Sequence, residues 1–169
     1  MFRSLILIGV ATVAATVAAS AQTTNTPPSP PAQNSQFDFW IGTWSLTWEG
    51  GTGTNTIRRE CDGAVVVENF AAQAGSALKG MSVSVFDARA GQWRQAWVDN
   101  QGSYLDFTGG LEGDRMVLSR KANVQGKDIV QRMVWYNIAQ DAFDWNWERS
   151  DDEGKTWTVV WKIHYARRS

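Results

Sequence analysis

Tryptophan recurs along this chain mostly at even spacings. The pairs are Trp44 and Trp48, Trp93 and Trp97, Trp145 and Trp147, and Trp157 and Trp161. Side chains alternate across a β-strand with a period of two, so each pair places two indole rings on the same face of a strand. The pattern predicts a sheet that wraps around an aromatic interior.

Short runs rich in β-branched and aromatic residues follow one another beyond residue 42, separated by turn sequences such as Asp62-Gly63. The expected strands are residues 43–48, 55–61, 64–72, 79–86, 92–99, 103–108, 115–121, 128–137, 143–150 and 157–167, after a helical turn at residues 37–41. The chain lacks the long crossings that a Greek-key sandwich needs. We therefore predict an all-β fold, an antiparallel up-and-down barrel of about ten strands.

Aromatic content then assigns the faces of the first and last strands. On the first strand we expect Trp44, Leu46 and Trp48 to point inward. On the last strand the expected inward residues are Trp157, Val159, Trp161, Ile163 and Tyr165. An interior of this kind is lined by tryptophan and tyrosine.

Residues 1–21 have the features of an export signal. Arg3 precedes an apolar run over residues 5–19, and Ala19-Ser20-Ala21 forms a small-x-small cleavage sequence. The run is short and rich in alanine, so we expect no stable membrane span. We predict cleavage before Gln22 and a mature protein in the bacterial periplasm or outside the cell.

Residues 22–36 hold all four prolines of the chain among polar residues, which predicts a disordered tether. Residues 37–169 then form one barrel domain. The formal net charge of −1, with no basic cluster, argues against nucleic acid and anionic membranes as partners. The single cysteine, Cys61, has no partner for an internal disulfide, and we expect a buried, inert thiol.

The sequence Phe37-Asp38-Phe39-Trp40-Ile41-Gly42-Thr43-Trp44 leads a helical turn into Gly-x-Trp on the first strand. This resembles the lipocalin and fatty-acid-binding-protein (calycin-type) barrels. It also resembles an uncharacterised group of exported bacterial proteins that begin with the same motif and that contain a stretch like residues 93–100. The resemblance implies that Gly42 and Trp44 lie at the closed end of the barrel, with Arg167 packed against the tryptophan. It further implies an interior that binds a small ligand.

A second motif, Ser150-x-Asp152-x-Gly154-x-Thr156-Trp157, resembles the Asp-box hairpin of sialidase propellers. Its serine and aspartate side chains can cap turn amides, its glycine can adopt a positive φ, and its tryptophan can pin the hairpin. Propellers repeat the box in each blade, whereas it occurs once in this chain. We interpret it as a structural turn.

Candidate chemical groups are few. His164 is the only histidine, and because it alternates with Ile163 and Tyr165 we expect it to face solvent, which argues against haem ligation. One histidine and one cysteine do not make a zinc site, so we expect neither metal nor cofactor. Asp144 and Glu148 share a face opposite Trp145 and Trp147, and we expect both carboxylates to be solvated. Only if they faced inward could this pair act as a glycosidase-type acid pair.

Three functional hypotheses follow. The first is a non-enzymatic barrel that binds a mostly apolar or aromatic molecule; its candidate binding residues are Glu68, Trp93, Gln95, Trp97, Tyr104, Trp135, Trp145 and Trp147. The second is a barrel filled by its own side chains that acts as a structural or protein-interaction module. The third is an enzyme that uses inward carboxylates. A ligand site needs roughly 300 Å³ or more, so cavity volume separates the first two hypotheses.

Overall fold

The computed structural model describes residues 32–168. Along its strands, side chains alternate between the interior and the outer surface. A 3-10 helix, η1 (Ala32–Trp40), precedes ten strands. The strands are β1 (Gly42–Trp48), β2 (Gly51–Glu60), β3 (Val65–Ala74), β4 (Lys79–Asp87), β5 (Gln92–Asp99), β6 (Tyr104–Glu112), β7 (Arg115–Val124), β8 (Lys127–Tyr136), β9 (Ala142–Ser150) and β10 (Thr158–Arg167).

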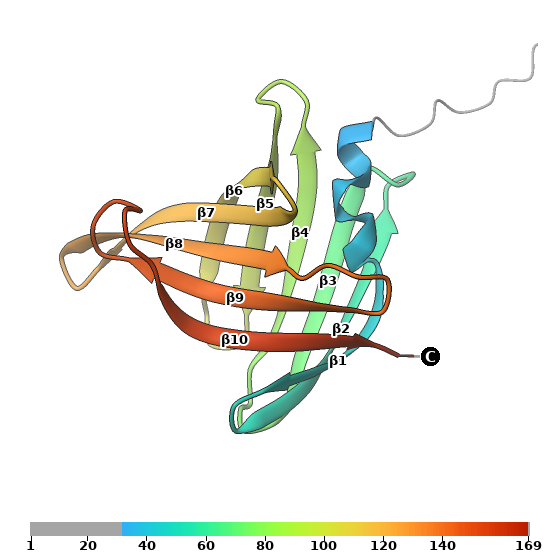
Figure 1. Ribbon diagram of the computed structural model, residues 1–169, viewed down its shortest axis with the longest axis horizontal. Helices are drawn as coiled ribbons and strands as arrows, with labels where there is room; N and C mark the ends of the chain where they lie inside the picture. Colours follow the sequence, from blue (N-terminus) through green and yellow to red (C-terminus); the bar gives the residue numbers. More distant parts are fainter. Residues whose placement is uncertain (1–31, 169) are drawn as a thin grey trace, which may run out of the picture.

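Each strand pairs antiparallel with its neighbours in sequence, and β10 pairs with β1 to close the barrel (Figure 1). The predicted all-β up-and-down barrel is confirmed, with several strands extended by a few residues at their ends. The export signal and cleavage site lie outside the described residues, as does the proline-rich part of the tether. No helix within residues 32–168 combines the length and apolar character that a membrane-crossing helix needs.

Helix η1 closes one end of the barrel, on the far side of the molecule from the β9–β10 loop (Figure 1). It begins at Ala32, earlier than the sequence indicates, and its residues Phe37 and Trp40 are 0% and 1% exposed. The Phe37 ring meets Trp93 edge-on at 4.7 Å and Trp135 at 5.4 Å between centroids. Burying one such ring contributes roughly 5 kcal/mol before entropy costs. This end of the interior is therefore filled.

Arg167 of β10 contacts β1 where these two strands meet beside the helix. Trp44 of β1 pairs with Arg167 of β10, whose guanidinium lies 4.2 Å from the centroid of the Trp44 ring. Arg167 Nη1 also donates to the Ile41 carbonyl at 2.9 Å. Gly42 has a φ of 139°, and a Cβ there would clash with the Arg167 guanidinium. Glycine at this position thus leaves room for the Arg167 guanidinium beside the β1–β10 pairing that closes the barrel.

The start of β10 departs from the expected faces. Val159 and Val160 are both exposed, and the pairing of β10 with β9 shifts register between Val159 and Trp161. A bulge adds one residue and reverses the alternation, so Val159 points outward while Trp161 points inward. Trp157 lies before the strand, with the Arg132 guanidinium 3.8 Å from its ring centroid.

Cys61 was also expected to be buried, but the β2–β3 turn exposes it.

We predict that Phe37→Ala lowers the free energy of unfolding by about 3–5 kcal/mol, because it removes a fully buried ring from the closed end. Urea denaturation measures the loss. Tyr104→Ala is the matched control, since that ring is 67% exposed and its truncation should cost within about 0.5 kcal/mol. A Phe37→Ala cost no larger than that of the control would contradict the plugged end.

Candidate functional site

A cavity of about 240 Å³ occupies the half of the barrel away from η1. Its wall is almost entirely apolar and includes five tryptophans, Trp97, Trp135, Trp145, Trp147 and Trp161. Four of these rings are only partly buried, whereas Trp135, nearest the plug, is 1% exposed. Solvent therefore reaches the cavity at the end opposite the helix.

Edge-to-face contacts hold the rings of the wall in place. Trp145 meets Trp161 at 5.8 Å and Trp135 at 6.5 Å between centroids. Across the cavity, Phe70 contacts both Trp97 and Trp161, at 6.1 and 6.0 Å. The quadrupoles of aromatic rings favour such arrangements over face-to-face stacks. The wall is thus fixed by its own contacts.

The position of the Trp97 ring also requires a residue without a side chain on the neighbouring strand β4. Its indole lies against Gly80, where a Cβ would clash with the ring. The indole Nε1 donates to Asp99 Oδ2 at 3.0 Å, and Asp99 is itself part of the cavity wall. Trp97 is therefore held from two sides at the open end.

A band of buried polar groups crosses the interior between the plug and the cavity. Glu68 of β3 is 7% exposed and lies in the cavity wall. Its carboxylate accepts hydrogen bonds from Asn55 Nδ2 and from the Ser82 hydroxyl, both at 2.6 Å. Asn55 also donates to the Tyr165 hydroxyl at 3.3 Å. The band gives an otherwise apolar cavity one polar wall.

The pKa values of both ionisable groups of this band are raised. Burial raises the pKa of Glu68, and the hydrogen bonds from Ser82 and Asn55 offset part of that rise. Burial, and the nearby Glu68 carboxylate, raise the pKa of Tyr165, so its hydroxyl stays protonated. Glu68 is thus the one group of the band whose charge can respond to what the cavity holds.

The structure separates three residues that the sequence grouped as one binding set. Trp97 lines the cavity, but Trp93 is buried at the closed end, where its Nε1 donates to Gln36 of η1 at 3.0 Å. Gln95 lies between them, outside the cavity wall, and donates to the Ser84 hydroxyl at 2.9 Å. All three share a face, but they lie at different depths along the barrel.

Tyr104, another predicted binding residue, lies outside the cavity wall. It is 67% exposed, whereas its neighbours Leu105 and Phe107 line the cavity. Leu105 and Phe107 share the opposite face of β6 from Tyr104, and it is that face that points inward. The orientation of β6 buries these two apolar side chains and leaves the single tyrosine exposed.

Several wall residues were not predicted as part of a site. They are Phe70, Leu78, Asp99, Leu105, Phe107, Met133, Trp161, Ile163 and Tyr165. Alternation carried the signal for part of this set, because Phe70 shares a face with Glu68, and Met133 with Trp135. Leu78 lies in the β3–β4 loop, outside any strand, so periodicity gave no signal for it.

A second feature adjoins the cavity at the seam between β1 and β10. These strands pair only from Trp44↔Arg167 to Thr47↔His164. Where that pairing ends, an outer groove of about 530 Å³ begins, and Trp161 lines both this groove and the cavity. Trp48 meets Trp161 edge-on at 5.3 Å. These two rings close the seam.

The predicted acid pair lies on the outer surface of β9, not in the interior. Asp144 bonds to His164 Nδ1 at 2.9 Å, and the His164 side chain is half exposed. Glu148 also faces outward, but contrary to the expectation it is shielded from solvent. It is 7% exposed because Arg132 covers it, with Arg132 Nε 2.7 Å from its Oε2. A two-carboxylate mechanism inside the barrel therefore has no support from this pair.

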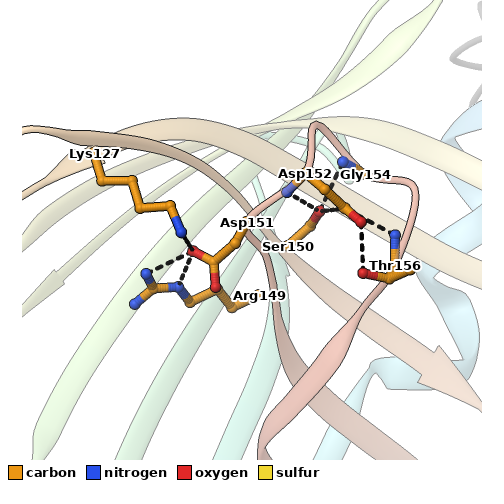
Figure 2. Close-up of polar contacts among 7 residues, drawn as sticks. All are labelled: Lys127, Arg149, Ser150, Asp151, Asp152, Gly154 and Thr156. Atoms are coloured by element: carbon orange, nitrogen blue, oxygen red, sulfur yellow. Dashed lines mark hydrogen bonds and ion pairs between the residues drawn. The ribbon is translucent and has the colours of Figure 1, made fainter.

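The Asp-box hairpin lies at the open end, between β9 and β10 (Figure 2). Ser150 Oγ accepts from the Gly154 amide at 2.7 Å, and Asp152 accepts from the Thr156 amide at 2.8 Å. Gly154 has a φ of 90°. Figure 2 also shows Asp151 between Lys127 and Arg149, which ties the hairpin to β8. These contacts make a rigid structural turn.

Comparisons with known proteins do not extend this description, since neither a protein-family model nor a curated protein matches the chain. Residues 32–168 contain no cluster of three or more histidine, cysteine, aspartate or glutamate side chains suited to hold a metal ion. The tryptophan-walled cavity is the feature from which a function must be argued.

We predict a pH-dependent contribution of Asp152 to stability. Hydrogen bonds from Thr156 and Ser150 hold its pKa well below the ordinary aspartate value of about 3.9. The contribution is fully present above that ordinary value and is lost as pH falls below it toward the lowered pKa. Asp152→Asn should therefore be less stable than wild type at pH 6, by a margin that shrinks below about pH 4.

Urea denaturation of both proteins between pH 6 and pH 2 measures this margin. The other carboxylates titrate alike in the two proteins and cancel in the difference. A margin that stays constant over this range would contradict the assignment.

Proposed function

We propose that this barrel binds a small, mostly apolar or aromatic molecule in its open-end cavity and does no chemistry on it. One observation carries the proposal: the aromatic interior is filled at the η1 end and hollow at the other. A module filled throughout by its own side chains would leave no such space. The cavity of about 240 Å³, walled by five tryptophans, is smaller than the roughly 300 Å³ expected for a ligand site, but it is larger than the roughly 150 Å³ that holds benzene, so it favours a site for a small ring over the filled-core alternative.

The volume limits the size of the ligand. An engineered apolar cavity of about 150 Å³ holds benzene, whereas drug-sized ligands occupy roughly 300–1,000 Å³. A space of about 240 Å³ suits one ring or two fused rings rather than a long fatty chain. Rings of this kind make edge-to-face contacts with the indoles of the wall.

We further propose kinship with the lipocalin and fatty-acid-binding-protein barrels, including the exported bacterial group that shares the opening motif. The closed barrel of ten antiparallel strands supports this at the level of fold. So does the position of Arg167 over Trp44 beside Gly42. The proposed ligand class rests on the cavity and not on this kinship.

The proposed site of action is the bacterial periplasm or the exterior of the cell. The argument is the charged start, apolar run and Ala-Ser-Ala sequence of residues 1–21. Expression in a bacterial host followed by N-terminal sequencing of exported protein tests it, and the mature chain should begin at Gln22. Exported protein that begins at Met1 would refute cleavage.

The binding proposal predicts that filling the cavity abolishes ligand uptake. Isothermal titration calorimetry with indole should detect binding to the wild type. Leu105→Trp, which adds a ring to the cavity wall, should weaken that binding at least tenfold.

Val98→Trp is the matched control, because Val98 lies outside the cavity wall and is 41% exposed; it should bind like the wild type. Near-ultraviolet circular dichroism confirms that both variants fold. Binding that is equal in all three proteins would place the site elsewhere, and undetectable binding of indole and other single- or fused-ring probes to the wild type would refute the proposal.

A further inference from the structure

The ionisable groups of the cavity wall are all acidic or phenolic. They are Glu68 at the buried end, Asp99 near the open end, and Tyr165. The wall contains neither lysine, arginine nor histidine. A ligand with a carboxylate would find two carboxyl groups and no counter-ion, which disfavours its entry.

Glu68 has unused capacity to accept hydrogen bonds. Its two hydrogen-bond donors, Asn55 and Ser82, are neutral, and each occupies one carboxylate oxygen. A carboxylate offers about four acceptor sites, so about two stay open. Burying a carboxylate without a cation is unfavourable, or it shifts the group to its neutral form. A cationic partner would remove that penalty.

The polar band also contains an unpartnered acceptor. Asn55 Oδ1 is buried beside Glu68 and has no hydrogen-bond partner among residues 32–168, although Asn55 itself does not line the cavity. The unpartnered donor in the cavity wall, Trp135 Nε1, belongs to a neutral ring and does not offset the charge of Glu68. The Glu68 carboxylate is therefore the group of this wall that favours a ligand bringing hydrogen-bond donors.

The tryptophans supply a second attraction for positive charge. A cation near the face of an indole is attracted by the negative face of the ring, and cages of aromatic rings bind alkylammonium groups in this way. Asp99 lies near the open end. Burial favours a higher pKa for this carboxyl group, but hydrogen bonds from Trp97 and Ser103 lower its pKa and keep it ionised. A cation would thus meet negative charge near the entrance and again at the buried end.

We propose that the ligand of this cavity is a small aromatic amine that binds as its cation. Its ammonium group donates to the Glu68 carboxylate, and its ring lies among Trp97, Trp145, Trp147 and Trp161. An ammonium carries three donors, enough to fill the two or so open acceptor sites of Glu68. This assignment rests on the proposed function, since it names the chemistry of the ligand that the same cavity takes.

The test compares three probes that share a phenyl ring and differ in the end group: 2-phenylethylamine, 2-phenylethanol and phenylacetate. Isothermal titration calorimetry at pH 7 should show the amine binding at least tenfold more tightly than the alcohol, and phenylacetate most weakly. Glu68→Gln keeps the shape of the side chain and removes its charge, so the amine should lose its advantage while the alcohol binds as before.

Asp106→Asn is the matched control, because it removes one negative charge at an exposed position outside the cavity wall. It should preserve the preference for the amine. A preference lost equally in both variants would mean that net charge, rather than Glu68, attracts the amine, and would overturn the assignment.

The wild-type comparison needs no variant and separates the two proposals. If the alcohol binds as tightly as the amine, the cavity is a ligand site but the cationic assignment is wrong. If phenylacetate binds most tightly, the assignment is reversed. If none of the three probes binds, and indole and its like do not bind either, the proposed function itself fails.

Discussion

The pairing of β10 with β1 is the constraint on which the rest of this molecule depends. Once the sheet closes, every second side chain of each strand points into one shared interior. Water can then reach that interior only through the ends of the barrel. Closure is made beside η1, where Trp44 pairs with Arg167 and the guanidinium covers the indole. The pairing ends at Thr47↔His164, and beyond it Trp48 and Trp161 close the seam by ring contact instead of backbone hydrogen bonds.

Closure also divides the interior into layers of different chemistry. Phe37, Trp40 and Trp93 fill the end beneath the helix and are at most 1% exposed. The polar band follows, with Glu68 held between Asn55 and Ser82. The tryptophan-walled cavity lies beyond it. The filled layer supplies the stabilising burial, which allows the open layer to keep apolar surface in reach of solvent for a ligand.

The sequence predicts which face of a strand a side chain occupies far better than it predicts the depth of that side chain along the barrel. Alternation correctly turned Trp44 and Leu46 inward, because a period of two reports only which face a residue occupies. Depth depends on strand tilt and on what plugs the barrel, which is why Trp93 and Trp97, both inward, belong to different layers. Alternation also fails where a strand bulges, as between Val159 and Trp161. Tyr104 shows a third limit, since aromatic size was a poorer guide to its strand than the apolar pair Leu105 and Phe107.

The central claim is that one aromatic interior is rigidly filled at one end and receptive at the other. Nuclear magnetic resonance of the indole N–H groups in ¹⁵N-labelled protein tests it directly, because the chain has ten tryptophans spread over both layers. On addition of indole, the resonances of Trp97, Trp145, Trp147 and Trp161 should shift, while those of Trp40, Trp44 and Trp93 should stay in place. Shifts confined to the second group, or equal shifts in both groups, would contradict the account.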